Sequence, residues 1–184
     1  TYAVIPGHTY SVSTASIALE RGFEVLIHMP MEALGPAPGE LEYRLKLAMS
    51  SDEIRRRMRV ALRTLPMAAG VNNHQGSAAT GDKRVMGVVG SELKRADKFF
   101  LDSITSARSV AEVTMKIHGV PTAHRDVFLD NYDDVDYIRQ QVYILADIAR
   151  SQGFAVGIGH VRYKTLLVLR EAIPSLKEDG FEFA

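Results

Sequence analysis

The chain of 184 residues has no cysteine, no tryptophan and no excess of either charge. Without cysteine it can form neither a disulfide framework nor a thiolate metal site, so any metal ion would need histidine and carboxylate ligands. Its 22 Lys and Arg residues balance its 22 Asp and Glu residues, which argues against a nucleic-acid partner. We interpret the one basic run, Arg55-Arg56-Arg57-Met58-Arg59, as the solvated face of a helix.

Long apolar runs are also missing. No segment approaches the ~20 apolar residues that a membrane-spanning helix needs, and the first residues do not resemble a signal peptide. The chain opens without an initiator Met on a strand-like segment, so we expect it to be a fragment whose N-terminus lies upstream. With 46% hydrophobic residues, residues 1–184 can build one sizeable core, which predicts a single domain.

What the sequence does contain is an alternation of short apolar runs with amphipathic segments. Strands are predicted over 2–5, 24–27, 68–71, 98–101, 154–158 and 181–183, with 123–129 a mixed segment. Helices are predicted over 11–21, 50–65, 83–96, 109–117, 133–152 and 163–176, and a long loop is expected in the first half of 33–47. The helix from 50 has a capping box, Ser50 with Glu53, and Gly153 should end the helix from 133.

This alternation is typical of an α/β protein with a parallel sheet, either doubly wound or closed as a barrel. In both architectures ligands bind at the carboxyl ends of the strands. No GxGxxG or GxxxxGK[ST] motif follows a predicted strand, which disfavours nucleotide binding through such loops.

Three histidines follow predicted strands at equivalent positions, namely His28, His74 and His160. One such histidine alone is more often structural, but three favour a shared site. His8, at another strand end, could join them. Structural roles are expected for His118 and His124.

A histidine and carboxylate donor set without cysteine suits Zn²⁺ or a related divalent ion, and hydrolysis is the natural chemistry of such an ion. Glu32 lies four residues after His28, so it could reach the same ion, or it could be a charge at a helix N-terminus. His160 is our candidate for the proton donor to a leaving group.

Asp126 lies beside Arg125, and an ion pair between them could orient a catalytic imidazole. Asp102 and Asp130 are predicted either as substrate contacts or as turn and N-cap residues.

The double amide Asn72-Asn73 has no evident structural reason at the end of a buried strand. Its donors and acceptors could bind sugar hydroxyls or an acyl carbonyl. The candidate substrate-binding residues are therefore Asn72, Asn73, Asp102, Arg125 and Asp130.

Five motifs in order along nearly the whole chain closely resemble those of the divergent polysaccharide deacetylase family. They are His28-Met29-Pro30-Met31-Glu32, Gly70–Ser77, Phe99–Ser103, Arg125–Asn131 and Ile158–His160. That family is similar to the NodB-type carbohydrate esterases. The resemblance implies a distorted (β/α) barrel that uses a divalent metal, most simply zinc, to remove acetyl groups from a glycan, and it implies a periplasmic or exported protein.

The resemblance also implies roles for residues. His28 falls at the first metal histidine, and either His74 or Glu32 would replace the second. His160 falls at the late histidine that acts as acid, and we expect Asp126 to hold it. The first strand, with an Asp-Asp motif that supplies a ligand and the base, should precede the chain.

Other positions depart from the family pattern. Ala78 stands where an arginine is expected and Val161 where a proline is expected. The missing arginine, together with Glu32 in place of the second metal histidine, favours an alternative, a catalytically degenerate barrel that binds a glycan or a protein partner. An unrelated barrel lyase or isomerase is a third possibility, although the glycine loop that binds phosphate in such barrels is missing.

Overall fold

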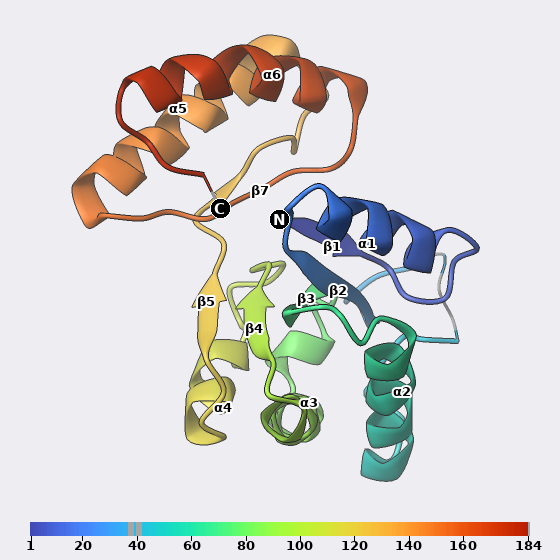
Figure 1. Ribbon diagram of the computed structural model, residues 1–184. Helices are drawn as coiled ribbons and strands as arrows, with labels where there is room; N and C mark the ends of the chain where they lie inside the picture. The colour runs from blue at the N-terminus through green and yellow to red at the C-terminus, as the bar shows by residue number, and fades with distance from the viewer. Residues whose placement is uncertain (37–38, 40–41, 184) are drawn as a thin grey trace. The chain divides into compact units, whose positions relative to one another are not determined.

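The structure, a computed structural model, describes residues 1–36, 39 and 42–183 (Figure 1). Positions 37, 38, 40 and 41 of the predicted loop lie outside the described residues. The chain divides into two compact units, residues 1–124 and 125–184, and each is described by itself. The single domain over residues 1–184 stays a prediction.

The first unit contains a sheet of five parallel strands, in the spatial order β1-β2-β3-β4-β5. The strands are β1 (Tyr2–Val4), β2 (Val25–Met31), β3 (Gly70–Gln75), β4 (Phe99–Asp102) and β5 (Thr122–His124). The connections hold α1 (Ser11–Glu20), α2 (Ser51–Thr64), a 3₁₀ turn (Ala79–Gly81), α3 (Lys83–Ala96) and α4 (Ala111–Ile117). This confirms the α/β class.

The strand order matters because every crossover steps to the next position in the same direction. Right-handed crossovers of that kind place all helices on one face of the sheet. A doubly wound sheet would instead reverse direction at a switch point. The first unit therefore has the order of a barrel wall, although the strand pairs among the described residues form two separate sheets and do not close a barrel.

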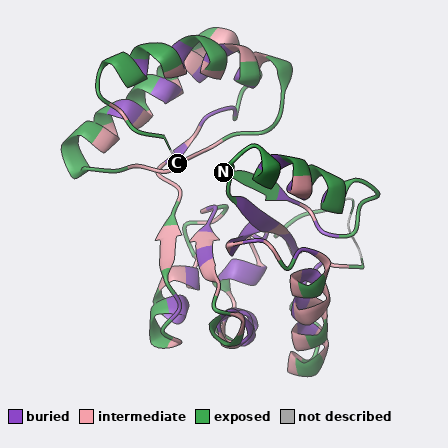
Figure 2. Cartoon of the chain, in the orientation of Figure 1, coloured by how far each residue is buried: buried purple, intermediate pink, exposed green. Residues whose placement is uncertain are grey.

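Alternate strand residues build the core beneath the helices. Ile27, Met29 and Met31 of β2 are fully buried there with Val71 and Phe100. The helices meet them with Ile54, Met58, Val85, Val89 and Met115. Figure 2 shows β2 as a buried strand, and only His28 within it is partly exposed.

β2 and β3 extend further than predicted. Expected over 24–27 and 68–71, they run to Met31 and Gln75 because the ladder continues through the pairs Pro30↔His74 and Met31↔Gln75. Met29, Met31 and Asn73 keep facing the core along this extension. His28 and His74 therefore lie within strands and not in the loops after them.

The second unit packs α5 (Val135–Gln152) and α6 (Tyr163–Glu178) over two short parallel strands, β6 (Val127–Phe128) and β7 (Gly157–Ile158). Its core is formed by Val127, Leu129, Ile138, Val142, Ala146, Val168, Ala172 and Leu176. As predicted, α5 ends at Gly153, which adopts a φ of 88° that glycine tolerates. Among the described residues, no helix has the length and apolar content to cross a membrane.

The mixed segment contributes to two different strands, and one predicted strand is wrong. The mixed segment 123–129 divides, since β5 pairs with β4 and β6 pairs with β7. Residues 181–183 form no strand. Instead Phe181 packs against the core of the second unit. The Cζ atom of Arg150 lies over the Phe181 ring, 5.1 Å from the ring centroid.

The helix caps are partly as expected. Ser50 Oγ accepts a hydrogen bond from Glu53 N, which is half of the predicted capping box. The Glu53 carboxylate instead binds Arg56 and Arg57, whose hydrogen bonds lower the pKa of Glu53 to about 2.

The basic run is more than a solvated face. Arg59 donates two hydrogen bonds to Glu92 of α3, at 2.7 and 3.2 Å, and Arg55 Nε lies 3.4 Å from the same carboxylate. The Glu92 side chain is only 2% exposed. A buried carboxylate needs such partners, so this contact joins α2 to α3.

We predict that Glu92→Ala lowers the free energy of unfolding by about 1–2 kcal/mol, because the contact between α2 and α3 loses the charge-assisted hydrogen bonds from Arg59. Urea unfolding measures the change. Glu112→Ala is the matched control, since the exposed Glu112–Lys116 pair should contribute under about 0.5 kcal/mol. Equal losses in the two variants would contradict the prediction.

Candidate functional site

Two histidines meet on one face of the sheet in the first unit. In the parallel register His28 lies beside Asn72, and His74 lies two residues further along β3, beside Pro30. Their side chains project from the face opposite the helices. His74 Nδ1 lies 3.0 Å from His28 Nε2, and the ring centroids are 4.7 Å apart.

Asn72 holds the other side of the His28 ring. Its Oδ1 lies 2.9 Å from His28 Nδ1, and its Nδ2 donates to Ser103 Oγ at 3.3 Å. Asn72 is 2% exposed and Ser103 is 4% exposed. The amide therefore does have a structural partner on each side.

Asn73 faces the opposite way and anchors the loop after β4. Its Oδ1 accepts from Ser103 N at 2.8 Å, and its Nδ2 donates to Gln75 O at 2.8 Å. Ser103 Oγ donates to Asn73 O at 2.9 Å. Both amides are nearly fully buried, and their predicted contacts with substrate stay a prediction.

Asp102 shapes the same loop from within. Its carboxylate accepts from Ile104 N at 2.9 Å and from Ser109 Oγ at 2.5 Å, which fits its expected alternative as a turn residue. Ile104 has a φ of 45°, a conformation that a β-branched side chain disfavours. Strain of this kind is typical of segments whose geometry serves a site.

Glu32 lies at the end of β2 but its carboxylate is used locally. Oε2 accepts from Leu47 N at 2.6 Å, while the backbone oxygen accepts from Ala78 N and Ala79 N. Within the described ranges, no three His, Asp or Glu side chains gather closely enough to hold a metal ion. Two of the three predicted ligands, His28 and His74, are thus brought together.

In the second unit His160 is held by Asp130. Asp130 Oδ1 lies 3.0 Å from His160 Nδ1, and Oδ2 accepts from His160 N at 2.8 Å and Thr165 Oγ1 at 2.9 Å. The Asp130 side chain is fully buried, whereas that of His160 is 48% exposed. Burial raises the pKa of Asp130, but the hydrogen bonds from His160 and Thr165 outweigh it, and the net pKa is lowered.

Asp126 has a different position from the one we expected. It lies before β6, and its Oδ2 accepts from Val156 N at 2.7 Å, so Asp130 takes the place beside His160 that we predicted for Asp126. Arg125 stacks on Phe128, with 5.0 Å from its Cζ to the ring centroid. Phe128 in turn lies 5.5 Å from the His160 ring.

Ser103 and Thr165 are not among the predicted site residues, although both contact residues that are. Ser103 could have been found from its place directly after the Asp102 strand end. Thr165 gives no such signal, because it lies in the first turn of α6, a position where threonine is common.

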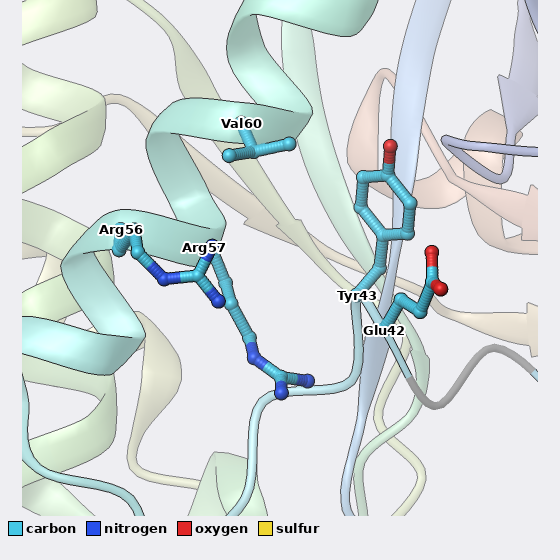
Figure 3. A pocket seen from close by; sticks show the side chains of 5 residues that line it. All are labelled: Glu42, Tyr43, Arg56, Arg57 and Val60. Atoms are coloured by element: carbon cyan, nitrogen blue, oxygen red, sulfur yellow. The ribbon is translucent and has the colours of Figure 1, made fainter.

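A pocket of about 280 Å³ lies elsewhere in the first unit. It is lined by Arg56, Arg57 and Val60 of α2 and by Glu42 and Tyr43 (Figure 3). None of the predicted site residues lines it, and Glu53 already pairs with both arginines. We assign it no role in the site.

The strand order and the motif residues can now be compared with known proteins. A family model described as divergent polysaccharide deacetylase matches residues 1–184. The chain belongs to the divergent polysaccharide deacetylase family. This confirms the resemblance. The third possibility, an unrelated barrel lyase or isomerase, is therefore wrong.

The relatives are themselves uncharacterized. Over 177 residues the chain is 36% identical to an uncharacterized protein of Haemophilus influenzae and 38% identical to the uncharacterized protein YibQ of Escherichia coli strain K12. These alignments cover 96% of this chain but 63% and 55% of the relatives, so the chain spans less than two thirds of their lengths.

A solved structure supports the fold alone. The crystal structure of an uncharacterized protein from Agrobacterium tumefaciens C58 has a TM-score of 0.86, at 22% identity. It covers 92% of this chain and 71% of that one.

We predict that Asp130→Asn lowers the free energy of unfolding at pH 7 by about 1–3 kcal/mol, because the variant side chain cannot accept all the hydrogen bonds that end on the carboxylate. The lowered pKa means that the ionised carboxylate stabilises the fold above the unfolded value of about 3.9, and that this contribution disappears as pH falls through the lower folded value. Urea unfolding at pH 7 and at pH values below about 4 should show the gap shrinking.

Asp147→Asn serves as the control, because Asp147 is exposed and pairs with Arg150 in its own helix. A gap for Asp130→Asn that is constant across this range would refute the electrostatic explanation.

Proposed function

We propose that this chain is the catalytic part of a metal-dependent hydrolase that removes acetyl groups from a polysaccharide or cell-envelope glycan. Family membership supports the glycan as substrate class. The observation that carries the proposal is the His28–His74 pair, in which two ring nitrogens face each other at 3.0 Å.

The two histidines supply the nitrogen donors of the proposed metal site. Two nitrogen ligands of one Zn²⁺ ion, each about 2.0–2.1 Å from the metal, lie roughly this far apart. The Nδ1 atom of His28 is held by Asn72. Metal-binding histidines are usually held in this way at the nitrogen that does not bind the metal. A divalent ion bound there would polarise a carbonyl and lower the pKa of a water molecule. A further ligand would come from Glu32, if it left Leu47 N.

His160 is the proposed proton donor to the leaving group. Its Nδ1 is held by Asp130, which leaves Nε2 on the half-exposed edge of the ring to transfer a proton. In this role Asp130 orients the ring in place of Asp126. Arg125, stacked on Phe128, is the proposed substrate contact of this unit.

An exported location is part of the same proposal and follows from the family resemblance. Deacetylation of an envelope glycan requires an enzyme that meets its polymer outside the cytoplasm.

We expect His28→Ala and His74→Ala in the full-length protein to remove stoichiometric metal and to abolish acetate release from an N-acetylated or O-acetylated oligosaccharide. Elemental analysis after dialysis and an acetate assay measure the two effects. His124→Ala is the matched control, because His124 is exposed and pairs with Glu112. Metal and activity that survive both site variants would refute the assignment.

We expect His160→Ala to behave differently, with kcat reduced about 10²–10⁴-fold and metal content unchanged. Asp130→Asn should lower kcat less and shift its pH profile, because it changes the orientation of the ring and not the donor itself. Full activity in His160→Ala would exclude it as the acid.

One observation favours a second function, a glycan-binding module without catalysis. Glu32 stands at a metal-ligand position of the resemblance, yet its carboxylate accepts from Leu47 N at 2.6 Å. Such a module has no need of a tightly held ion. Wild-type full-length protein that binds the oligosaccharide but holds no metal and releases no acetate would support it.

A further inference from the structure

We infer that Ser103 is a positioning residue that fixes which nitrogen of His28 carries the proton. Its hydroxyl sets the orientation of Asn72, and Asn72 then holds His28 with a proton on Nδ1 and a lone pair on Nε2. The importance of this lone pair for an ion rests on the proposed function, but the tautomer itself does not.

The hydroxyl of Ser103 has a single proton, and it lies beside Asn73 O and the Asn72 side chain. Asn73 O, a backbone carbonyl 2.9 Å away, can only accept. The hydroxyl therefore donates to it and offers a lone pair to the Asn72 side chain, 3.3 Å away. Ser103 N also donates to Asn73 Oδ1, so the residue is held in this position by its backbone as well.

Asn72 must then present its NH₂ group to Ser103 and its oxygen to His28. An amide oxygen can only accept, so the contact of 2.9 Å between Asn72 Oδ1 and His28 Nδ1 requires a proton on Nδ1. The opposite orientation of the amide would place its oxygen against a hydroxyl whose proton is already used. Since Asn72 is buried, water cannot supply hydrogen bonds that would make the opposite orientation of the amide equally favourable.

A neutral imidazole with a proton on Nδ1 has its lone pair on Nε2. This nitrogen faces His74 Nδ1 at 3.0 Å. In the ion-free protein His74 therefore donates to His28, and in the proposed metal site the same lone pair is the one available to the ion.

The test is NMR of the full-length protein with ¹⁵N-labelled histidine, treated with a chelator, without substrate and at a pH where imidazole is neutral. We expect His28 to show a pyrrole-type Nδ1 and a pyridine-type Nε2. In Ser103→Ala both nitrogens should move to intermediate shifts as Asn72 is released, and Ser103→Thr, which keeps the hydroxyl, should restore the wild-type pattern.

Ser109→Ala is the matched control, because it removes a hydroxyl from the same loop that bonds Asp102 instead. It should leave the His28 signals unchanged. A proton on Nε2 in the wild type would overturn the inference whether or not any variant folds, as would an unaltered pattern in folded Ser103→Ala.

This readout is separate from the proposed function. A protein with the expected tautomer but no metal or activity would refute the function and not the inference. If both hold, Ser103→Ala should also weaken metal binding by about 10–100-fold, the usual effect of removing a group that orients a ligand.

Discussion

The parallel pairing of β2 with β3 is the constraint on which the first unit depends. The same register buries Met29 and Met31 under the helices and brings His28 against Asn72 on the other face. A slip of one residue would exchange the two faces, turning the imidazoles into the core and the methionines out of it. The register of β2 with β3 thus determines both the core packing and the site geometry. The buried apolar residues stabilise the register that brings the polar side chains together.

His28 in the first unit and His160 in the second are each held by Nδ1, but with a different partner. An amide oxygen holds His28, and a buried carboxylate holds His160. A neutral acceptor orients a ring without adding charge, which suits a ligand that must keep its lone pair. A carboxylate also stabilises a ring that gains a proton, which suits an acid–base residue. The two partners fit the roles proposed for the two rings, a metal ligand for His28 and a proton donor for His160.

Much of the fold could be predicted from the sequence, because the order of helices and strands and the helix ends at Ser50 and Gly153 depend on local sequence. The end of β3 could not be predicted. Asn72, Asn73 and His74 are polar, and only their pairing with β2 shows that they continue the strand. The partner of His160 could not be predicted from the sequence either. Asp126 and Asp130 flank the same short strand, and spacing does not tell which one turns toward the β7 end. Phe181 has the residue type of a strand, but its burial against α5 and α6 depends on tertiary contacts.

The sequential strand order has a consequence for how the first unit forms. Each strand pairs with the next one in the chain, so every closed loop is only one crossover long and the sheet can grow by successive addition. The histidines lie on an interior strand pair, β2 and β3, with further strands on both sides. Pairing of β2 with β3 brings the two histidines together, and the addition of β4 then places Ser103 against Asn72.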